Sequence, residues 1–561
     1  MADLATQPPS TTVEHTGKAD DTGRGKWWRD SVIYQLYVKS FADSDGDGIG
    51  DLDGITARLD YLVSLGVDGL WLNPCYPSPN HDGGYDVANY LTIDERYGGL
   101  PAFERLLAAA HDRGLRVLMD LVPNHCSDQH EWFTSALAAA PGSSERTRFI
   151  FANGKGPDGS QPPNNWRSTF GGPAWTRVAE SDGTPGQWYL HSFDPSQPDF
   201  NWKNSEVVDM FDTVLRTWFD RGIDGFRIDV AYAMVKAEGL PDLLDPEGYN
   251  PYLWNQPGVH EVLKHWRMVV DGYDRELTLL GEVWLSPTDA ADYIRPGELK
   301  QVFYFDLLQQ PFEAAAFRLS IAETMDGLKQ AAGAPTWTLN SHDVHRAVTR
   351  YGLIEPEPPR TADANALRTR ARGRIDLQLG TRRATAAMML MLALPGSVYL
   401  YQGEELGLPE VQDLPDDARK DPIWERSGHI EYGRDGCRVP LPWHADQPNF
   451  GFSTGMPWLP QPAWFTQFAA DRQEINEDSV LTLYRFALAA RRKFDPTAGL
   501  EWLETGRDDL LAFRRGNFIS ATVFGGPPFD VPAAWGRVLL ANAPTVDHQL
   551  LQDTTAWFRT A

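Results

Sequence analysis

The chain has 561 residues, and its 51 Lys and Arg against 77 Asp and Glu give a formal charge of −26. This balance excludes a protein built mainly to bind nucleic acid, because such proteins neutralise phosphates with clustered basic side chains. The 42% of hydrophobic residues is ample for a large core, yet no apolar stretch approaches the roughly 20 residues that span a bilayer.

The start of the chain and the cysteine content predict its compartment. Residues 1–25 are rich in Thr, Pro, Asp and Gly, and they lack the apolar segment of a signal peptide, so we expect a disordered head. Three cysteines (Cys75, Cys126 and Cys437) are too few for a disulfide framework. Together these features predict a soluble, cytoplasmic protein without a membrane partner.

From residue 26 onward, short strand-like runs alternate with helix-length amphipathic segments. In 206–219, for example, apolar residues recur at three- and four-residue steps, which is typical of a helix with one buried face. Similar patterns in 56–65 and 100–111 predict two further helices. The predicted strands are, in chain order, 32–38, 67–72, 116–122, 225–230, 279–284, 303–307, 335–340 and 397–402.

This alternation predicts an α/β fold with a parallel sheet and right-handed crossovers, and eight strands are the number that closes a (β/α)8 TIM barrel. An open doubly wound sheet is the alternative, but no glycine-rich dinucleotide turn follows the first strand. We therefore favour the barrel, formed by residues 26–125 and 206–496.

Two long segments interrupt the alternation. Residues 126–205, after the third strand, are rich in Gly, Pro, Asn, Trp and Phe and too long for a loop, so they predict an inserted subdomain. A second Pro- and Gly-rich excursion covers 403–462. From 497 to 561, apolar and polar residues alternate, which predicts a C-terminal β-sandwich.

Chemistry in such a barrel takes place at the carboxyl ends of its strands. The fourth predicted strand ends in Arg227 and Asp229, which share one face, so the guanidinium is expected to hold the carboxylate ionised. The fifth predicted strand ends in Glu282, and the seventh in His342 and Asp343. Cleavage with retention at a sugar carbon needs one carboxylate nucleophile and one carboxylic acid about 5 Å apart, and a third carboxylate can bind ring hydroxyls in the transition state.

The chain resembles the α-amylase superfamily of glycoside hydrolases (family 13), in its α-glucosidase and oligo-1,6-glucosidase branch, over about 27–560. The matching segments are, in chain order, DLVPNH (120–125), QPDFN (197–201), GFRIDV (225–230), GEVW (281–284), HD (342–343), LPGSVYLYQGEELGLP (394–409) and GRDGCRVPLPW (433–443). The last two look like actinobacterial-type α-glucosidases.

The resemblance implies Asp229 as nucleophile, Glu282 as general acid and base, and Asp343 as the acid that stabilises the transition state. Arg227 and His342 then match positions around the sugar at the cleavage site.

His125 matches a third position around that sugar. Asp82 matches an acid that grips the terminal hydroxyls of a non-reducing glucose, and Tyr85 the aromatic platform under the ring. Arg434 matches an arginine that closes the pocket, with Arg438 as second candidate. Such a blind pocket implies exo-acting cleavage.

The segment 43–51 spaces carboxylates through glycines, as a loop for a hard cation needs. The family carries Ca²⁺, sometimes Mg²⁺, at this place, so the expected structural metal ligands are Asp43, Asp45, Asp47 and Asp51, with the backbone carbonyl of Ile49. An EF-hand is disfavoured because its twelfth position would be Gly54. No organic cofactor is implied.

Some neighbouring residues receive structural assignments. Asp86 is assigned as a structural acceptor, His345 and Arg346 to helix capping or surface pairing, and the Met-rich run 388–391 to a buried helix. Val230 directly follows the nucleophile, and it does not decide between α-1,4 and α-1,6 bonds.

The expected function is therefore a retaining, exo-acting α-glucosidase for short α-glucosides, with transglucosylation when a sugar or alcohol outcompetes water. An isomerase of the trehalose synthase kind or a dedicated glucosyltransferase shares the same acids and remains open. A non-catalytic superfamily member is the third alternative. Linkage, acceptor and oligomeric state stay undetermined.

Overall fold

The computed structural model describes residues 26–180, 182–331, 333–356, 373–546 and 548–560. The predicted disordered head lies outside the described residues. Within these ranges, no helix has the length and apolar character needed to cross a membrane.

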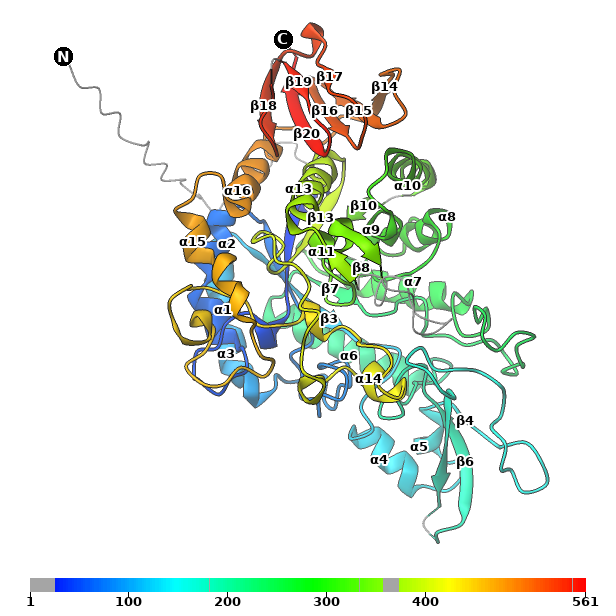
Figure 1. The fold of residues 1–561 in the computed structure, drawn as a ribbon. Helices are drawn as coiled ribbons and strands as arrows, with labels where there is room; N and C mark the ends of the chain where they lie inside the picture. The colour runs from blue at the N-terminus through cyan, green and yellow to red at the C-terminus, as the bar shows by residue number, and fades with distance from the viewer. Residues whose placement is uncertain (1–25, 181, 332, 357–372, 547, 561) are drawn as a thin grey trace, which may run out of the picture.

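Eight parallel strands form a closed barrel, as predicted (Figure 1). Around the barrel the order is β1-β13-β10-β9-β8-β7-β3-β2, so each strand pairs with its neighbours in sequence and β13 closes against β1. The strands are β1 (Val32–Leu36), β2 (Gly69–Leu72), β3 (Arg116–Leu121), β7 (Gly225–Ile228), β8 (Thr278–Gly281), β9 (Gln301–Phe303), β10 (Ala334–Trp337) and β13 (Ser397–Tyr401).

Helices follow the strands and cover the outside of the barrel. In α6 (Ser205–Arg221), the Asn204 side chain accepts from the Glu206 N–H at the start, and Gly222 ends the helix at a φ of 112°. The predicted helix in 206–219 is thereby confirmed. The other covering helices are α1 (Leu52–Ala57), α2 (Leu59–Leu65), α3 (Gly99–Asp112), α7 (Gly258–Asp271), α8 (Pro287–Ala291), α9 (Phe305–Gln309), α10 (Ala314–Gly327), α11 (Ala347–Gly352), α13 (Leu377–Ala393) and α16 (Val480–Arg491).

One predicted strand is wrong in position. The run 303–307 was expected to be the sixth strand, but β9 ends at Phe303 and Phe305 already begins α9. A short apolar run does not distinguish a strand from a buried helix by its periodicity. The first strand is also shorter than predicted, because Val38–Ser40 forms a 3-10 turn.

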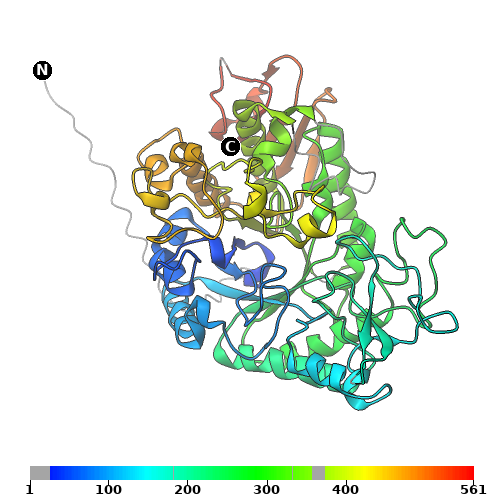
Figure 2. The ribbon, with the colours of Figure 1, turned by 60° about the horizontal axis from the view of Figure 1, so that its bottom comes forward.

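The segment after β3 forms a small separate layer. It contains α4 (Glu131–Ala138), α5 (Ser144–Thr147) and a three-stranded sheet of β4 (Phe151–Ala152), β6 (Pro185–Leu190) and β5 (Trp175–Ala179). The excursion after β13 contains α14 (Pro422–Arg426), and α15 (Ala470–Glu474) follows it. Arg426 donates to the Gly171 carbonyl over 3.0 Å, so the two insertions meet (Figure 2).

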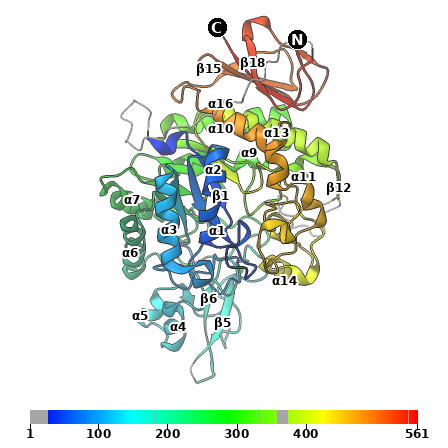
Figure 3. The same ribbon diagram turned by 90° about the vertical axis from the view of Figure 1, so that its left-hand side faces the viewer.

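The C-terminal residues form antiparallel sheets, as the all-β prediction required. One sheet has the order β14 (Glu501–Leu503), β15 (Leu510–Arg515), β16 (Phe518–Val523), β20 (Thr554–Arg559), β18 (Arg537–Ala541), and the other pairs β17 (Phe529–Asp530) with β19 (Gln549–Leu550). Figure 3 shows these sheets at the end of the molecule opposite to β5 and β6.

The Met-rich run lies in α13 beneath these sheets. Met388, Met389 and Met391 are fully buried, which confirms the predicted buried helix. The Trp557 indole donates to the Met389 carbonyl over 3.2 Å, so the C-terminal sheets rest on the barrel through this helix.

Candidate active site

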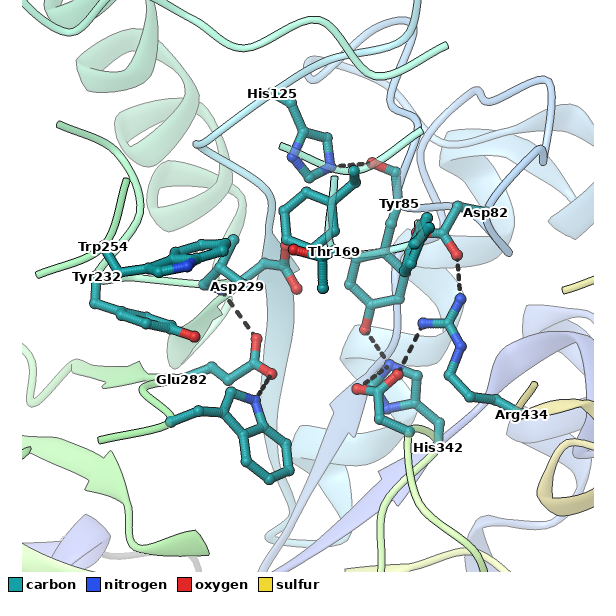
Figure 4. Close-up of a pocket in the computed structure, with 15 residues that line it drawn as sticks. Asp82, Tyr85, His125, Thr169, Asp229, Tyr232, Trp254, Glu282, His342 and Arg434 are labelled. Atoms are coloured by element: carbon teal, nitrogen blue, oxygen red, sulfur yellow. Dashed lines mark hydrogen bonds and ion pairs between the residues drawn. The ribbon is translucent and has the colours of Figure 1, made fainter. Parts of the chain in front are cut away.

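A pocket of about 90 Å³ opens at the carboxyl ends of the barrel strands (Figure 4). It is enclosed by the loops after several strands and by both insertions. Its lining consists of Asp82, Tyr85, His125, Thr169, Phe170, Phe193, Asp229, Val230, Tyr232, Trp254, Glu282, Trp284, His342, Asp343 and Arg434. All the predicted catalytic and substrate-binding residues are in this lining except Arg227, which lies beneath it.

Arg227 joins three acids: Asp120 within β3, and Asp229 and Glu282 just after β7 and β8. Its Nη1 is 2.8 Å from Asp229 Oδ1 and 2.8 Å from Asp120 Oδ1, and its Nη2 is 2.6 Å from Glu282 Oε2. The side chain of Arg227 is buried, so no water competes for these bonds. A single guanidinium thus orients Asp229 and Glu282 toward one cavity.

The backbone at Val230 also contributes to this arrangement. Val230 has a φ of 35°, which a β-branched residue rarely adopts. In this conformation the Val230 N–H donates to Glu282 Oε2 over 2.9 Å, while the Trp284 indole donates to Glu282 Oε1 over 2.8 Å. Both carboxylate oxygens of Glu282 therefore accept a hydrogen bond, one from the Val230 backbone and one from the Trp284 side chain.

Electrostatics around Arg227 favour retention of a proton. Burial raises the pKa of Asp229, and Glu282 and Asp120 add to this rise while Arg227 opposes it. Burial likewise raises the pKa of Asp120 to about 6. Asp229 and Asp120 therefore keep a proton to higher pH than exposed acids do. The expectation that the Arg227 guanidinium holds Asp229 ionised is not met, because burial outweighs this ion pair and raises the pKa of Asp229.

The floor of the pocket is an ion-pair cluster around Arg434. Arg434 Nη2 is 2.6 Å from Asp82 Oδ1, and Nη1 is 3.0 Å from Asp343 Oδ1. Asp421 holds the other side of the guanidinium, with 2.6 Å between its Oδ2 and Arg434 Nε. Gln197 Nε2 donates to Asp82 Oδ2 over 3.1 Å. Arg438, the second candidate, lies 3.3 Å from Asp343 and is outside the lining.

Two histidines and a tyrosine complete the floor. The Tyr85 ring stacks on His342 with centroids 5.3 Å apart and an interplanar angle of 7°. Its hydroxyl donates to Asp120 Oδ2 over 3.0 Å. Burial lowers the pKa of His125 to about 4 and the pKa of His342 well below its ordinary value, so both imidazoles are neutral near pH 7 and can accept or donate hydrogen bonds.

Exposure separates the floor of the pocket from its mouth. Asp82, Tyr85 and Arg434 are each only 4–5% exposed. By contrast, Thr169 is exposed, and Trp254 and Trp284 are partly exposed. The pocket therefore opens toward Trp254 and Trp284 and is closed at the Asp82–Arg434 pair.

Three residues of this site were not predicted. Asp120 and Gln197 belong to the DLVPNH and QPDFN segments. These segments were recognised, but no role was predicted for the two residues. Asp421 had no motif. The sequence indicates Asp421 only indirectly. Arg434 was predicted to line the pocket, and a buried arginine needs an acidic partner.

Other assignments near the site can be compared with the structure. Asp86 accepts from Ser78 Oγ over 2.8 Å and from the His81 N–H over 2.8 Å, which confirms it as a structural acceptor. The surface pairing of His345 and Arg346 is wrong, because both are buried beneath the excursion. Arg346 stands at the N-cap position of α11, but its guanidinium donates to the Gln402 and Cys437 carbonyls.

The acidic loop after β1 lies apart from the pocket lining. One carboxylate oxygen each from Asp43, Asp45 and Asp51 lies within 4.8 Å of the others. Asp47 is not part of this group; its Oδ1 accepts from the Ile49 N–H over 2.7 Å. Three oxygen donors at such spacing suit a hard cation such as Ca²⁺ or Mg²⁺.

We expect the rate to fall as the pH drops through about 6. Burial raises the pKa of Asp82 to about 6 against the effect of Arg434, and that of Asp120 to about 6 against Arg227. Both carboxyls are ionised above this pH and lose their charge below it. Initial rates between about pH 4 and 8 measure the effect on kcat/KM. A profile that stays flat down to about pH 4.5 contradicts the expectation, and Asp82→Asn should make the acid limb shallower.

Comparison with known proteins gives one consistent result. The family described as alpha amylase, catalytic domain, matches residues 35–498. A probable alpha-glucosidase of Rhizobium meliloti (strain 1021) is 37% identical over 87% of each chain. A probable oligo-1,6-glucosidase of Bacillus subtilis (strain 168) is 31% identical over 93% of this chain and 96% of that one. The solved structure of an alpha-glucosyl transfer enzyme, XgtA, superposes with a TM-score of 0.81 at 34% identity, covering 95% of this chain and all of the other. The chain belongs to the alpha-amylase family of glycoside hydrolases.

Proposed function

We propose that this protein is a retaining, exo-acting α-glucosidase that removes glucose from the non-reducing end of short α-glucosides. The observation that supports this most directly is the closed floor, where Asp82 and Arg434 meet at 2.6 Å on the side of the pocket away from its mouth. A chain continuing past the bound glucose has no exit there. The names of the relatives, an α-glucosidase and an oligo-1,6-glucosidase, agree with this substrate class.

In the proposed reaction, Asp229 attacks the anomeric carbon while Glu282 gives its proton to the leaving oxygen. Water, or another hydroxyl, then attacks the same carbon. Glu282 removes its proton, and Asp229 leaves as a carboxylate. Asp343, held by Arg434 and Arg438, lies in the lining where it can bind ring hydroxyls as positive charge develops.

An incubation with soluble starch tests whether the enzyme cleaves at chain ends or at internal bonds. We expect free glucose to appear from the start, slowly, while the viscosity of the solution stays high, because only chain ends enter a closed pocket. Both quantities are followed in the same incubation. An early fall in viscosity with little free glucose indicates internal cleavage and contradicts the exo-acting proposal.

Glucosyl transfer is the second candidate, and the similarity to an alpha-glucosyl transfer enzyme favours it. Hydrolysis, transfer and isomerisation use the same three acids and differ in what attacks the glucosyl group. Incubation with maltose, isomaltose, sucrose and trehalose, with the products separated by chromatography, distinguishes them. Glucose as the dominant product supports hydrolysis; a new disaccharide without free glucose supports isomerisation.

We further propose that Asp43, Asp45 and Asp51, with Asp47 and the Ile49 carbonyl nearby, bind a structural Ca²⁺ or Mg²⁺. Their carboxylates lie close enough to repel one another without a cation. We expect chelation to lower the melting temperature, because a bound ion stabilises the folded state. Asp45→Ala combined with Asp47→Ala should abolish this difference. Asp60→Ala, which removes an acid that is 85% exposed, should preserve it.

A slowly released ion could mask the effect of chelation. Metal bound to the purified protein is therefore quantified as well, by elemental analysis. A metal-free protein whose melting temperature does not respond to added Ca²⁺ contradicts the proposal.

A further inference from the structure

Two buried amide side chains lie directly behind the pocket floor. Gln35 stands near the end of β1, and Asn73 follows β2. Each is only 2% exposed, and neither is among the described residues that line the pocket. Gln35 Nε2 lies 3.0 Å from Asn73 Oδ1 and 2.7 Å from His342 Nδ1. Gln35 therefore contacts, from behind, a histidine of the pocket floor.

Asp120 sets the direction of the hydrogen bonds in this group. Above the pKa of Asp120, which burial raises to about 6, its carboxylate only accepts hydrogen bonds. The Tyr85 hydroxyl must therefore donate its one hydrogen to Asp120 Oδ2, 3.0 Å away. Tyr85 Oη then accepts from its two other neighbours, Asn73 Nδ2 at 2.7 Å and His342 Nε2 at 2.7 Å (Figure 4). His342 Nε2 consequently carries a hydrogen.

The amides lead to the same result at the other nitrogen of the ring. Asn73 presents Nδ2 to Tyr85, so its Oδ1 faces Gln35 and accepts from Gln35 Nε2. This Nε2 carries two hydrogens and only donates, so its second hydrogen goes to His342 Nδ1. Burial lowers the pKa of His342 well below its ordinary value, so the ring is neutral and holds one proton. Nδ1 is bare, and the proton is on Nε2.

The protonated nitrogen is the one beside Asp343. His342 Nε2 is 3.3 Å from Asp343 Oδ2. A glucose hydroxyl bound between them donates to the carboxylate and accepts from the ring, so its direction is fixed. In the other tautomer both neighbours would be acceptors, and one hydroxyl hydrogen would serve only one of them.

We propose that Gln35 is a positioning residue: its amide holds His342 in the Nε2–H tautomer, so that the floor offers a bound glucose hydroxyl one donor beside the Asp343 acceptor. Gln35 acts through His342 and does not itself reach the pocket lining. The use of this hydrogen in the reaction rests on the proposed α-glucosidase function. The tautomer follows from the hydrogen bonds alone.

The tautomer can be measured in the wild-type protein. Long-range proton–nitrogen NMR spectra of protein with isotope-labelled histidine distinguish a protonated ring nitrogen from a bare one. The His342 signals are identified by their absence in His342→Asn. We expect a protonated Nε2 and a bare Nδ1 at about pH 7.5. A protonated Nδ1 overturns the inference, whether or not the enzyme cleaves glucosides.

Gln35→Glu reverses this hydrogen bond, because a carboxylate accepts from Nδ1–H and leaves Nε2 bare. One added proton, on the new carboxyl group or on the ring, restores the Nε2 hydrogen at lower pH. The ionisable groups that already face His342 are the same in both proteins. They are Tyr37, Tyr85, Arg227, Asp343, Arg434 and Arg438.

The kinetic test compares Gln35→Glu with the wild type on an aryl α-glucoside. We expect kcat/KM of the variant, divided by that of the wild type, to be about tenfold or more below one at about pH 8. This ratio should rise at least about fivefold as the pH falls to about 5.5. A ratio that does not change with pH overturns the inference, because a merely structural defect has no reason to recover in acid.

Two further variants separate positioning from stability. Gln35→Met removes the donor, so a protonated Nδ1 should appear in its spectrum and kcat/KM should fall about tenfold. Gln301→Met is the matched control, since the buried Gln301 amide at the start of β9 donates to the Trp28 carbonyl over 2.9 Å and to Ser397 Oγ over 2.8 Å. It should lower the melting temperature but leave the His342 spectrum and the pH profile unchanged. A wild-type His342 spectrum in Gln35→Met overturns the inference even if Gln35→Glu fails to fold.

Discussion

Asp229→Asn is expected to lower glucoside turnover by about three orders of magnitude or more while the protein remains folded. The amide keeps the shape of the side chain and its place beside Arg227, where Nη1 is 2.8 Å from Asp229 Oδ1. It removes the charge that attacks the anomeric carbon. Initial rates on an aryl α-glucoside and the melting temperature are measured together.

A control variant and a trapping experiment sharpen this test. Asp220→Asn makes the same chemical change at the Asp220 carboxylate that accepts from the Tyr273 hydroxyl on the surface, so it should leave the rate unchanged. A slowly turned-over 5-fluoro-glucosyl fluoride should lose fluoride and add one 5-fluoroglucosyl unit to the wild type, as seen by mass spectrometry, and none to Asp229→Asn. Near-normal turnover in a well-folded Asp229→Asn variant contradicts the assignment.

Asp82→Ala should have the second largest effect. Its carboxylate is expected to bind the terminal hydroxyls of glucose, and it pairs with Arg434 in a buried setting. Loss of a charge-assisted hydrogen bond there costs about 1.5–3 kcal/mol, or roughly 10- to 150-fold in kcat/KM. If this contact strengthens as the glucose ring flattens in the transition state, its loss should lower kcat as well as raise KM.

Asp421 provides a matched comparison for Asp82. Both carboxylates bind Arg434, at 2.6 Å each, but Asp421 is outside the pocket lining. Because they act through one guanidinium, the losses caused by Asp82→Ala and Asp421→Asn should not add in the double variant. Asp416→Asn, on an acid whose side chain is 74% exposed, is the control and should change nothing. Full additivity contradicts a shared role for Arg434.

Most of the barrel could be predicted because its signals are local. Amphipathic periodicity marked helices such as α6, and glycines such as Gly222 end helices because they tolerate a positive φ. The sixth strand was misplaced because Phe303 and Phe305 belong to one apolar run that contains both a strand end and a helix start. Burial, which depends on the surrounding chain, separates these two states where periodicity does not.

Residues of the site could be predicted where they lie at the ends of strands or in recognised sequence segments. Asp229, Glu282 and Asp343 follow barrel strands, so their convergence follows from the fold class alone. Asp120 and Gln197 stand in recognised segments, yet their bonds to Arg227 and Asp82 depend on side-chain positions that no spacing specifies.

Local patterns in the amino-acid order were thus sufficient for the eightfold alternation, the all-β C-terminal part and the three acids of the site. Only the folded chain shows that Arg434 reaches back across 352 residues to Asp82, that Asp421 holds it there, and that aromatic rings line the mouth. The physical reason is that helix and strand periodicity arise between neighbours in the chain, whereas ion pairs and stacked rings arise between segments that meet only when the barrel closes and its insertions pack over it.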